Sequence, residues 1–191
     1  MTMFGGSEDW QVHDQKTGRR KYLTADERRR FLAAADRQAP SKRALCHVLT
    51  YAGCRISEAL ALTIHQVDGE RLALTFRTLK RRRTVFRVVP VPQTVIDMVC
   101  ALPVEADGRL WRLHRVTAWR AVKATMQRAG IADGPGTCPK GLRHGFGICA
   151  AGHNVPTNLI QRWMGHARPT TTAIYLDAVG VEERQFAARM W

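Results

Sequence analysis

Two β-rich segments on either side of a short basic run constrain the fold of this chain more than any other sequence feature. Residues 72–76 (LALTF) and 84–89 (TVFRVV) carry the branched and aromatic side chains that favour strands, and the basic run LKRRR lies between them. Pro90 and Pro92 end the second segment. The pattern predicts one β-hairpin. Because most of the remaining chain has helical spacing, we expect a mainly α fold with a small antiparallel β-sheet, in the α+β class.

Local signals predict where the helices begin and end. Thr24 followed by Glu27 forms a capping-box pattern that opens a helix over Phe31 and Leu32. The pattern predicts further helices over 41–51, with Leu45, Val48 and Leu49 facing inward, over 55–62 after a break at Gly53, over 95–101, over 116–129, from Pro139 to a break at Gly152, and over 156–164. Thr170–Thr172 are expected to open a last helix that carries Tyr175.

The charge of the chain indicates a polyanionic partner. Its 191 residues fit one compact domain, and 30 Lys and Arg against 16 Asp and Glu give a net charge of +14 and a pI of about 10.6. Nucleic acid is the leading candidate for such a partner, and the alternative is a cationic face that is only solvated. Residues 1–21 are predicted to form a polar, basic tail, whose cluster KTGRRK either contacts phosphate or is solvated.

Several classes of protein are disfavoured by the sequence. The start MTMFGGSEDW lacks the cationic and apolar regions of a signal peptide. No apolar run approaches the roughly 20 residues that a membrane span needs. The cysteines lack CxxC spacing, which gives little support to a zinc site and favours reduced thiols in the cytosol. These are Cys46, Cys54, Cys100, Cys138 and Cys149. We therefore expect no metal, no other cofactor and no membrane partner.

Four residues in a fixed order indicate chemistry on a phosphate. Arg55 lies in YAGCRISEALAL, Arg143 in PKGLRHGFG, and His166 in MGHA, nine residues before Tyr175. Two arginines that can each bind two phosphate oxygens, a histidine and a late tyrosine make a phosphate-handling set with a nucleophile. This order and spacing resemble the tyrosine recombinases of the phage-integrase family, from about Leu23 to the C-terminus.

The resemblance assigns a role to each of these residues. Arg55 and Arg143 would bind the non-bridging oxygens of a DNA phosphate, and His166 would donate a hydrogen bond to it. Tyr175 would attack the phosphorus, form a 3′-phosphotyrosyl link and release a 5′ hydroxyl, with no metal or ATP. Glu58 matches the acidic residue expected to orient Arg55. From the residues alone, Arg55 and Glu58 could instead form a helix-surface ion pair, and Tyr175 could be a packing residue.

The basic hairpin matches another feature of the family, a mobile lysine thought to protonate the leaving 5′ oxygen. Lys80 would be this general acid, because neighbouring cations lower the pKa of an ammonium group. Arg81, Arg82 and Arg83 would supply those cations and contact DNA. The alternative is a hairpin tip that only contacts phosphate or is solvated.

Position 140 departs from the family pattern. The usual motif is His-x-x-Arg, whereas this chain has Lys140 three residues before Arg143. Lysine keeps a positive charge near a phosphate, but it does not act as a neutral imidazole base near pH 7. His144 matches the histidine that trails the motif, and we expect it to be a buried, hydrogen-bonded structural residue.

The resemblance also predicts how the chain is organised and with what it assembles. Residues 22–191 would be a tyrosine recombinase catalytic domain without the N-terminal DNA-clamping domain, similar in length to the fimbrial switch invertases. Expected partners are double-stranded DNA, further copies in a DNA-bound tetramer and an accessory DNA-binding protein. The segment VGVEERQFAARMW (179–191) would dock on a neighbouring copy or pack on its own domain. A cytoplasmic, nucleoid-associated protein of a prokaryote, phage or other mobile element is implied.

The function implied is site-specific DNA recombination in integration, excision or inversion. Two other readings stay open from the sequence. Lys140 and the short N-terminal region would also suit a DNA-binding protein that keeps the fold without catalysis. A type IB topoisomerase would share the tyrosine chemistry without four DNA-bound protomers.

Overall fold

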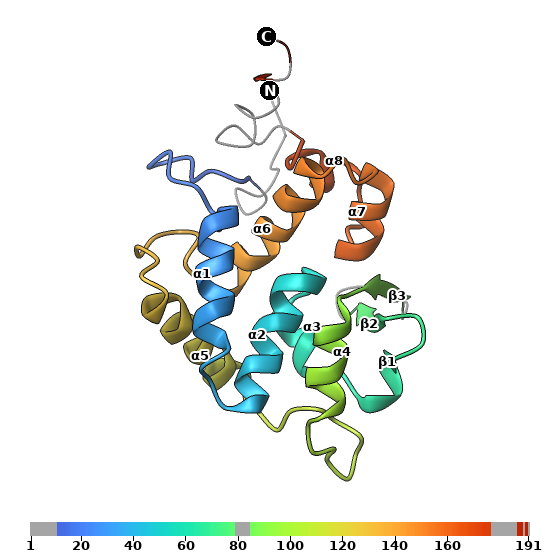
Figure 1. Ribbon diagram of the computed structural model, residues 1–191. Helices are drawn as coiled ribbons and strands as arrows, with labels where there is room; N and C mark the ends of the chain where they lie inside the picture. Colours follow the sequence, from blue (N-terminus) through green and yellow to red (C-terminus); the bar gives the residue numbers. More distant parts are fainter. Residues whose placement is uncertain (1–10, 79–84, 177–186, 189, 191) are drawn as a thin grey trace, which may run out of the picture.

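The structure, a computed structural model, describes residues 11–78, 85–176, 187, 188 and 190. Helices make up about half of the described residues, and one small antiparallel sheet lies at one side of them (Figure 1). The predicted fold class is therefore confirmed. Lys80, Arg81, Arg82 and Arg83 lie outside the described residues, as does most of the segment 179–191.

The first two helices form the centre of the molecule. Helix α1 (Ala25–Ala35) begins at the predicted capping box, in which the Thr24 hydroxyl accepts from the Glu27 amide and the Glu27 carboxylate accepts from the Thr24 amide. Helix α2 (Pro40–Ala52) is buried along most of its length and packs against α1, α4 and α6. It ends at Gly53, whose φ of 56° lies in the left-handed region that glycine adopts without strain.

A short helix and the sheet follow. Helix α3 (Ile56–Leu60) begins directly after Arg55 and is shorter than the predicted 55–62. The 3₁₀ helix η2 (Ile64–Gln66) leads into β1 (Val67–Asp68), which pairs antiparallel with β2 (Ala73–Thr78). Strand β2 pairs with β3 (Val85–Pro90), which confirms the hairpin. A two-residue strand such as β1 is too short to leave an alternating pattern, and the sequence analysis did not find it.

The second half of the chain supplies the helices that complete the molecule. They are α4 (Gln93–Cys100), α5 (Arg115–Arg128), α6 (Pro139–Gly152), α7 (Thr157–Met164) and α8 (Thr170–Ala173). The predicted helices over 95–101, 116–129 and 156–164 are thus confirmed within two residues. The prediction for Tyr175 is wrong in one respect, because α8 ends at Ala173 and Tyr175 lies in the turn that follows it.

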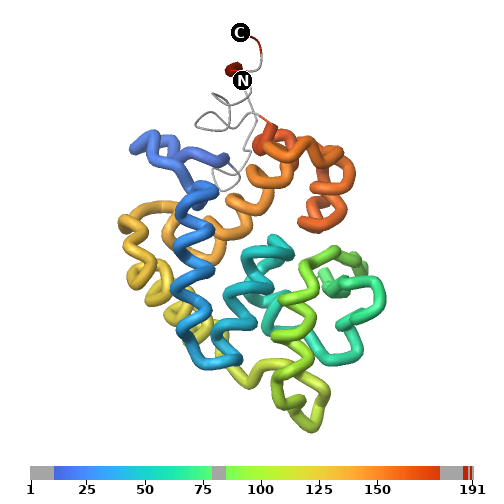
Figure 2. The backbone as a smooth tube through the Cα atoms, in the orientation of Figure 1, coloured from blue at the N-terminus to red at the C-terminus, as the bar shows by residue number. Residues whose placement is uncertain are grey.

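Two apolar clusters hold these elements together. The larger one contains the inward faces of α1, α2, α4, α5 and the sheet, including the predicted Leu45, Val48 and Leu49. The smaller one joins the N-terminal segment to α6, α7 and the turn after α8. Figure 2 shows these N- and C-terminal parts of the chain at the same end of the molecule. The smaller cluster consists of Val12, Tyr22, Ile148, Ala150, Ile160, Met164 and Tyr175.

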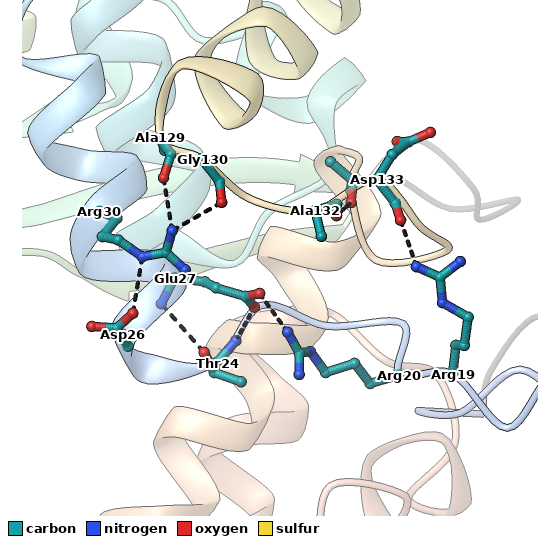
Figure 3. A network of polar contacts seen from close by, with 11 residues as sticks. Arg19, Arg20, Thr24, Asp26, Glu27, Arg30, Ala129, Gly130, Ala132 and Asp133 are labelled. Atoms are coloured by element: carbon teal, nitrogen blue, oxygen red, sulfur yellow. Dashed lines mark hydrogen bonds and ion pairs between the residues drawn. The ribbon is translucent and has the colours of Figure 1, made fainter.

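Residues 11–21, predicted as part of a polar tail, pack on the domain. Their backbone turns back on itself through a bridge between His13 and Arg20. Arg20 forms an ion pair with Glu27 of α1, and Arg19 donates to the carbonyl of Asp133 (Figure 3). Two arginines of the predicted phosphate-contacting cluster are therefore engaged within the protein. Over the described ranges, no helix has the length and apolar character to span a bilayer.

Candidate active site

The site is built where three chain segments meet: the α2–α3 junction, the middle of α6 and the end of α7. Arg143 on α6 is 5% exposed and reaches both of the other segments. Its Nη1 donates to the Gly53 carbonyl at 2.7 Å, and its Nη2 donates to the Met164 carbonyl at 2.7 Å. A single guanidinium thus fixes the relative placement of the three segments, because its planar donors point in fixed directions.

Burial lowers the pKa of Arg143 but leaves the guanidinium charged. Desolvation, followed by the nearby positive charge of Arg55, lowers the Arg143 pKa to about 10. A guanidinium with that pKa remains protonated at neutral pH. The site therefore contains a buried cation that repels the second arginine and attracts an anion.

Arg55 is the more accessible of the two predicted arginines, with 21% of its side chain exposed. It precedes α3, and its backbone amide and Nη1 both donate to the Glu58 carboxylate, at 2.8 Å and 2.9 Å. Glu58 is 1% exposed. The predicted pairing is therefore present, but it is a buried clamp and not the helix-surface ion pair of the alternative reading.

A third arginine, which the sequence analysis missed, holds the other side of Glu58. Arg87 on β3 donates from Nη2 to Glu58 Oε2 at 2.6 Å. Burial alone would raise the Glu58 pKa, but the charge and hydrogen bond of Arg87, together with Arg55, lower it overall. A signal was present in the sequence: Arg87 lies two residues from Val85 and Val89, on the inward side of the strand, where a charge needs a buried partner.

The end of α7 places His166. Helix α7 stops at Met164, and Gly165 adopts a left-handed φ of 66°. His166 is 4% exposed, and its Nδ1 lies 2.8 Å from Thr172 Oγ1 of α8. Burial, followed by the charges of Arg143 and Arg55, lowers the His166 pKa to about 3. The imidazole is therefore neutral at pH 7 and can donate one hydrogen bond from a fixed ring.

Tyr175 lies against this histidine. It is 2% exposed, and its ring stacks on His166 with centroids 6.1 Å apart and planes 20° apart. Burial raises the Tyr175 pKa to about 12, although the charges of Arg143 and Arg55 act in the opposite direction. Both guanidinium groups therefore act on the phenol electrostatically and favour its ionised form. The turn after α8 thus brings the predicted nucleophile to the predicted cations.

Helix α6 accommodates Tyr175 because it has no side chain at Gly147. A Cβ at this position would lie 2.7 Å from the Tyr175 ring. On the other side of the helix, a Cβ at Gly145 would lie 2.9 Å from the carbonyl oxygen of Leu23. Since two residues turn an α-helix by about 200°, these glycines face opposite directions. The helix therefore passes between the N-terminal segment and Tyr175 with bare backbone on both sides.

The remaining predicted residues differ in how they relate to the site. His144 is buried and hydrogen-bonded as predicted, with Nδ1 3.1 Å from the Tyr175 hydroxyl. Lys140 is partly exposed in the first turn of α6, one turn before Arg143. Among the described residues, no group of three or more His, Cys, Asp or Glu side chains is arranged to hold a metal ion.

Known proteins are similar to this chain in sequence and in fold. The model of the phage integrase family matches residues 21–179. Tyrosine recombinase XerD of Mycobacterium tuberculosis H37Rv is 29% identical in an alignment of 178 positions that covers 81% of this chain and 56% of that protein. Tyrosine recombinase XerA of Thermococcus onnurineus is 30% identical in an alignment of 167 positions that covers 81% of this chain and 57% of that protein. The chain thus spans little more than half the length of these curated relatives.

Solved structures resemble the molecule over most of its length. The crystal structure of XerA recombinase superposes with a TM-score of 0.76 at 25% identity, over 88% of this chain and 64% of that one. The catalytic domain of bacteriophage HP1 integrase gives a TM-score of 0.67 at 25% identity, over 87% of this chain and 93% of that one. The architecture is therefore that of a catalytic domain in these proteins.

Proposed function

Because the chain belongs to the phage integrase family, we propose that it is a site-specific DNA recombinase that cuts and rejoins strands through a 3′-phosphotyrosyl intermediate. The observation that carries the proposal is the convergence of Arg55, Arg143 and His166 on Tyr175 from four separate segments of the chain. A packing tyrosine has no need of two arginines and a neutral histidine beside it.

In the proposed reaction the tyrosine replaces the 5′ oxygen on phosphorus. The Tyr175 oxygen forms a bond to the scissile phosphorus as the bond to the 5′ oxygen breaks, and the phenol proton passes to water. With a pKa of about 12, the phenol is almost entirely protonated at neutral pH, so proton loss accompanies attack. Charge that develops on the non-bridging oxygens is stabilised by Arg55 and Arg143, with a hydrogen bond from His166.

The remaining predicted residues complete the scheme. Lys80 would protonate the leaving 5′ oxygen, and Arg81, Arg82 and Arg83 would contact DNA near it. Lys140 would add a positive charge one turn before Arg143, Glu58 would hold Arg55, and His144 would hold the phenol through its hydrogen bond. Rejoining reverses the step, with a 5′ hydroxyl attacking the phosphotyrosine and Tyr175 leaving.

The substrate that we propose is double-stranded DNA in the cytoplasm. A crystal structure with the same fold is that of the XerH site-specific recombinase bound to its difH substrate. The net charge of +14 supports a DNA partner. We propose that strand exchange joins two DNA sites within a tetramer, as part of integration, excision or inversion, and that an accessory protein contributes DNA contacts.

Trapping on a nicked substrate tests the proposal. A duplex that loses its 5′-hydroxyl fragment after cleavage cannot be rejoined, so covalent protein–DNA accumulates. We expect the parent protein and Tyr51→Phe, a control tyrosine on α2, to form the adduct, and Tyr175→Phe to bind DNA without forming it. An adduct with Tyr175→Phe would exclude this nucleophile. Absence of any adduct with the parent on DNA flanking its gene would favour a DNA-binding protein.

Products distinguish the remaining alternative. A recombinase given two sites yields four-way junctions and exchanged strands, whereas a type IB topoisomerase relaxes supercoils without exchange. Relaxation in the absence of junctions would therefore replace the recombinase assignment with the topoisomerase.

A further inference from the structure

Arg87 is a buried cation to which the family resemblance gave no role. It lies on β3 opposite Phe76 of β2, and its guanidinium carbon is 5.1 Å from the centre of that ring. Its side chain is only 3% exposed. A charge in such a place is costly unless it is paired and hydrogen-bonded, and Arg87 donates to three acceptors: Glu58, Thr78 and the Trp163 carbonyl.

The first contact links Arg87 to Arg55. Glu58 Oε2 accepts from Arg87 Nη2 at 2.6 Å and from the Arg55 backbone amide at 2.8 Å. The other oxygen, Oε1, accepts from Arg55 Nη1 at 2.9 Å. The Glu58 carboxylate thus accepts hydrogen bonds from Arg87 and from Arg55 at the same time. The orientation of the Arg55 guanidinium depends on both.

The second contact links Arg87 to the segment that carries His166. Arg87 Nε donates to the Trp163 carbonyl at 2.8 Å, and Arg143 takes the next carbonyl, that of Met164. These are carbonyls of the last turn of α7, which have no partner within the helix. The side chain of Arg87 also packs on Gly165, where a Cβ would lie 3.1 Å from its Cδ. His166 is the next residue.

We propose that Arg87 is a positioning residue that fixes Arg55 and His166 relative to each other. Arg87 acts from β3, and it touches no reacting atom. Lysine would not replace it, because one ammonium nitrogen cannot reach Glu58 and Trp163 in the directions that the planar guanidinium serves. The inference deepens the recombinase function proposed above and rests on it for its effect on rate.

Three variants test the effect on catalysis. Arg87→Met removes both contacts, and Arg87→Lys keeps a charge near Glu58. Arg71→Met is the matched control, because it removes an arginine of the same sheet region whose side chain is 84% exposed. At saturating DNA we expect Arg87→Met to slow adduct formation about a hundredfold, since a small misplacement of catalytic groups has effects of that size. Arg87→Lys should recover part of the loss, and Arg71→Met should match the parent. DNA affinity should change less than threefold in all of them.

A double-mutant cycle shows whether Arg87 acts through Glu58. We compare Arg87→Met, Glu58→Gln and the pair of changes for the rate of adduct formation. If both residues serve the same guanidinium, the double variant should be slowed far less than the product of the two single effects. Multiplying effects would overturn the link to Arg55.

Amide hydrogen exchange provides a measurement that needs no activity. In Arg87→Met, exchange should speed up at the Arg55 amide, which donates to Glu58, and at the His166 amide, which donates to Gln161. The α4 amides should be unchanged. If the parent protein forms no adduct, but exchange at both amides is faster in Arg87→Met, the positioning role is upheld and the recombinase function is rejected. A parent that forms adduct, with rate and exchange unchanged in Arg87→Met, would reject the positioning alone. Should Arg87→Met fail to fold, Arg87→Lys decides, and parental rate and exchange in that variant would overturn the proposal.

Discussion

The two arginines of the proposed site, Arg143 and Arg55, differ in how they are held in the folded protein. Arg143 uses two donors on backbone carbonyls of different segments, whereas Arg55 is held by one carboxylate and keeps part of its side chain exposed. Both are predicted to contact the phosphate. Only Arg143 has a second task in the folded state, so the two positions should respond differently to the same substitution.

We expect Arg143→Lys to lower the free energy of unfolding by about 1–3 kcal/mol, because at least one buried carbonyl loses its donor. Arg55→Lys should lower it by less than Arg143→Lys does, because among the described residues the Arg55 side chain hydrogen-bonds only to Glu58, which keeps its hydrogen bond from Arg87. Both should slow adduct formation about a hundredfold or more, as for the loss of an oxyanion donor. Urea unfolding and single-turnover trapping measure the two effects. Equal loss of stability at both positions would contradict the division of tasks.

His166 should make the folded protein sensitive to mild acid. The folded state lowers the His166 pKa from 6.5 to about 3, chiefly through burial. The unfolded chain therefore binds the proton first as the pH falls. The stability that this residue contributes is complete above pH 6.5 and is lost toward pH 3, at up to about 1.4 kcal/mol per pH unit.

The measurement is urea unfolding between pH 7.5 and 5, where most carboxylates stay ionised. The stability of the parent should fall across this range, and that of His166→Gln should fall less steeply. His65→Gln, at an exposed position, should behave like the parent. Identical slopes for the parent and His166→Gln would show that this imidazole is not held neutral by the fold.

At the scale of elements, sequence signals placed most helices because their ends are determined locally. The capping box at Thr24, the left-handed Gly53 and the proline in the first turn of α6 all act within a few residues. Tyr175 was assigned to a helix because nothing in the local sequence shows that α8 stops after four residues. Its position depends on contacts with α6 and α7, which are distant in sequence.

The residues of the site also differ in whether the local sequence points to them. Order and spacing identified Arg55, Arg143, His166 and Tyr175, because the family resemblance carries that information. Arg87 was missed because its importance comes from partners 29 and 76 residues away, on α3 and α7. Such contacts exist only after the sheet packs against the helices. The strand pattern shows that Arg87 faces inward, but it does not show which residues are its partners.

The glycines of α6 provide a prediction for the element as a whole. Gly147→Ala should displace the Tyr175 ring, which lies 2.7 Å from the site of the added Cβ, and should slow adduct formation about tenfold to a hundredfold. DNA affinity should be unchanged. Gly152→Ala is the matched control on the same helix, because its Cβ would meet nothing within 4 Å. Removing the flexibility of this glycine should raise stability by about 0.5–1 kcal/mol without altering the rate. Parental trapping by Gly147→Ala would show that the ring has room to move.

On the scale of the whole molecule, positive charge gathers around a hollow beside α3. The hollow has a volume of about 1190 Å³ and is lined by residues of α3, β2, the 105–114 loop and the start of α5. Its lining includes Arg77, Arg109, Arg112 and Arg115, of which Arg109 pairs with Asp107 and Arg112 with Glu105 of the same lining. Because α3 lines this hollow and directly follows Arg55, we expect the DNA backbone to lie on this surface.

DNA affinity should fall steeply with salt, with a slope of about −0.9 in log affinity against log salt for each phosphate neutralised. Arg77→Gln combined with Arg115→Gln should make the slope shallower by about 1.8, if each arginine neutralises one phosphate. Arg29→Gln with Arg37→Gln, two exposed positions at α1 and the loop after it, is the control for lost charge. Fluorescence anisotropy at several salt concentrations gives the slopes. A control pair that matches the test pair would show that net charge, and not this surface, binds DNA.

The glycines of α6 determine how closely two other parts of the chain approach this helix. The N-terminal segment at Leu23 and the ring of Tyr175 touch opposite sides of this helix at Gly145 and Gly147. At this level only the helix backbone, about 5 Å across its Cα atoms, lies between them, with one van der Waals contact on each side. No flexible atom lies between them to absorb a displacement. A shift of the N-terminal segment toward α6 by a fraction of an ångström must move either the helix or the phenol, and so changes the distance over which Tyr175 has to reach a phosphorus atom.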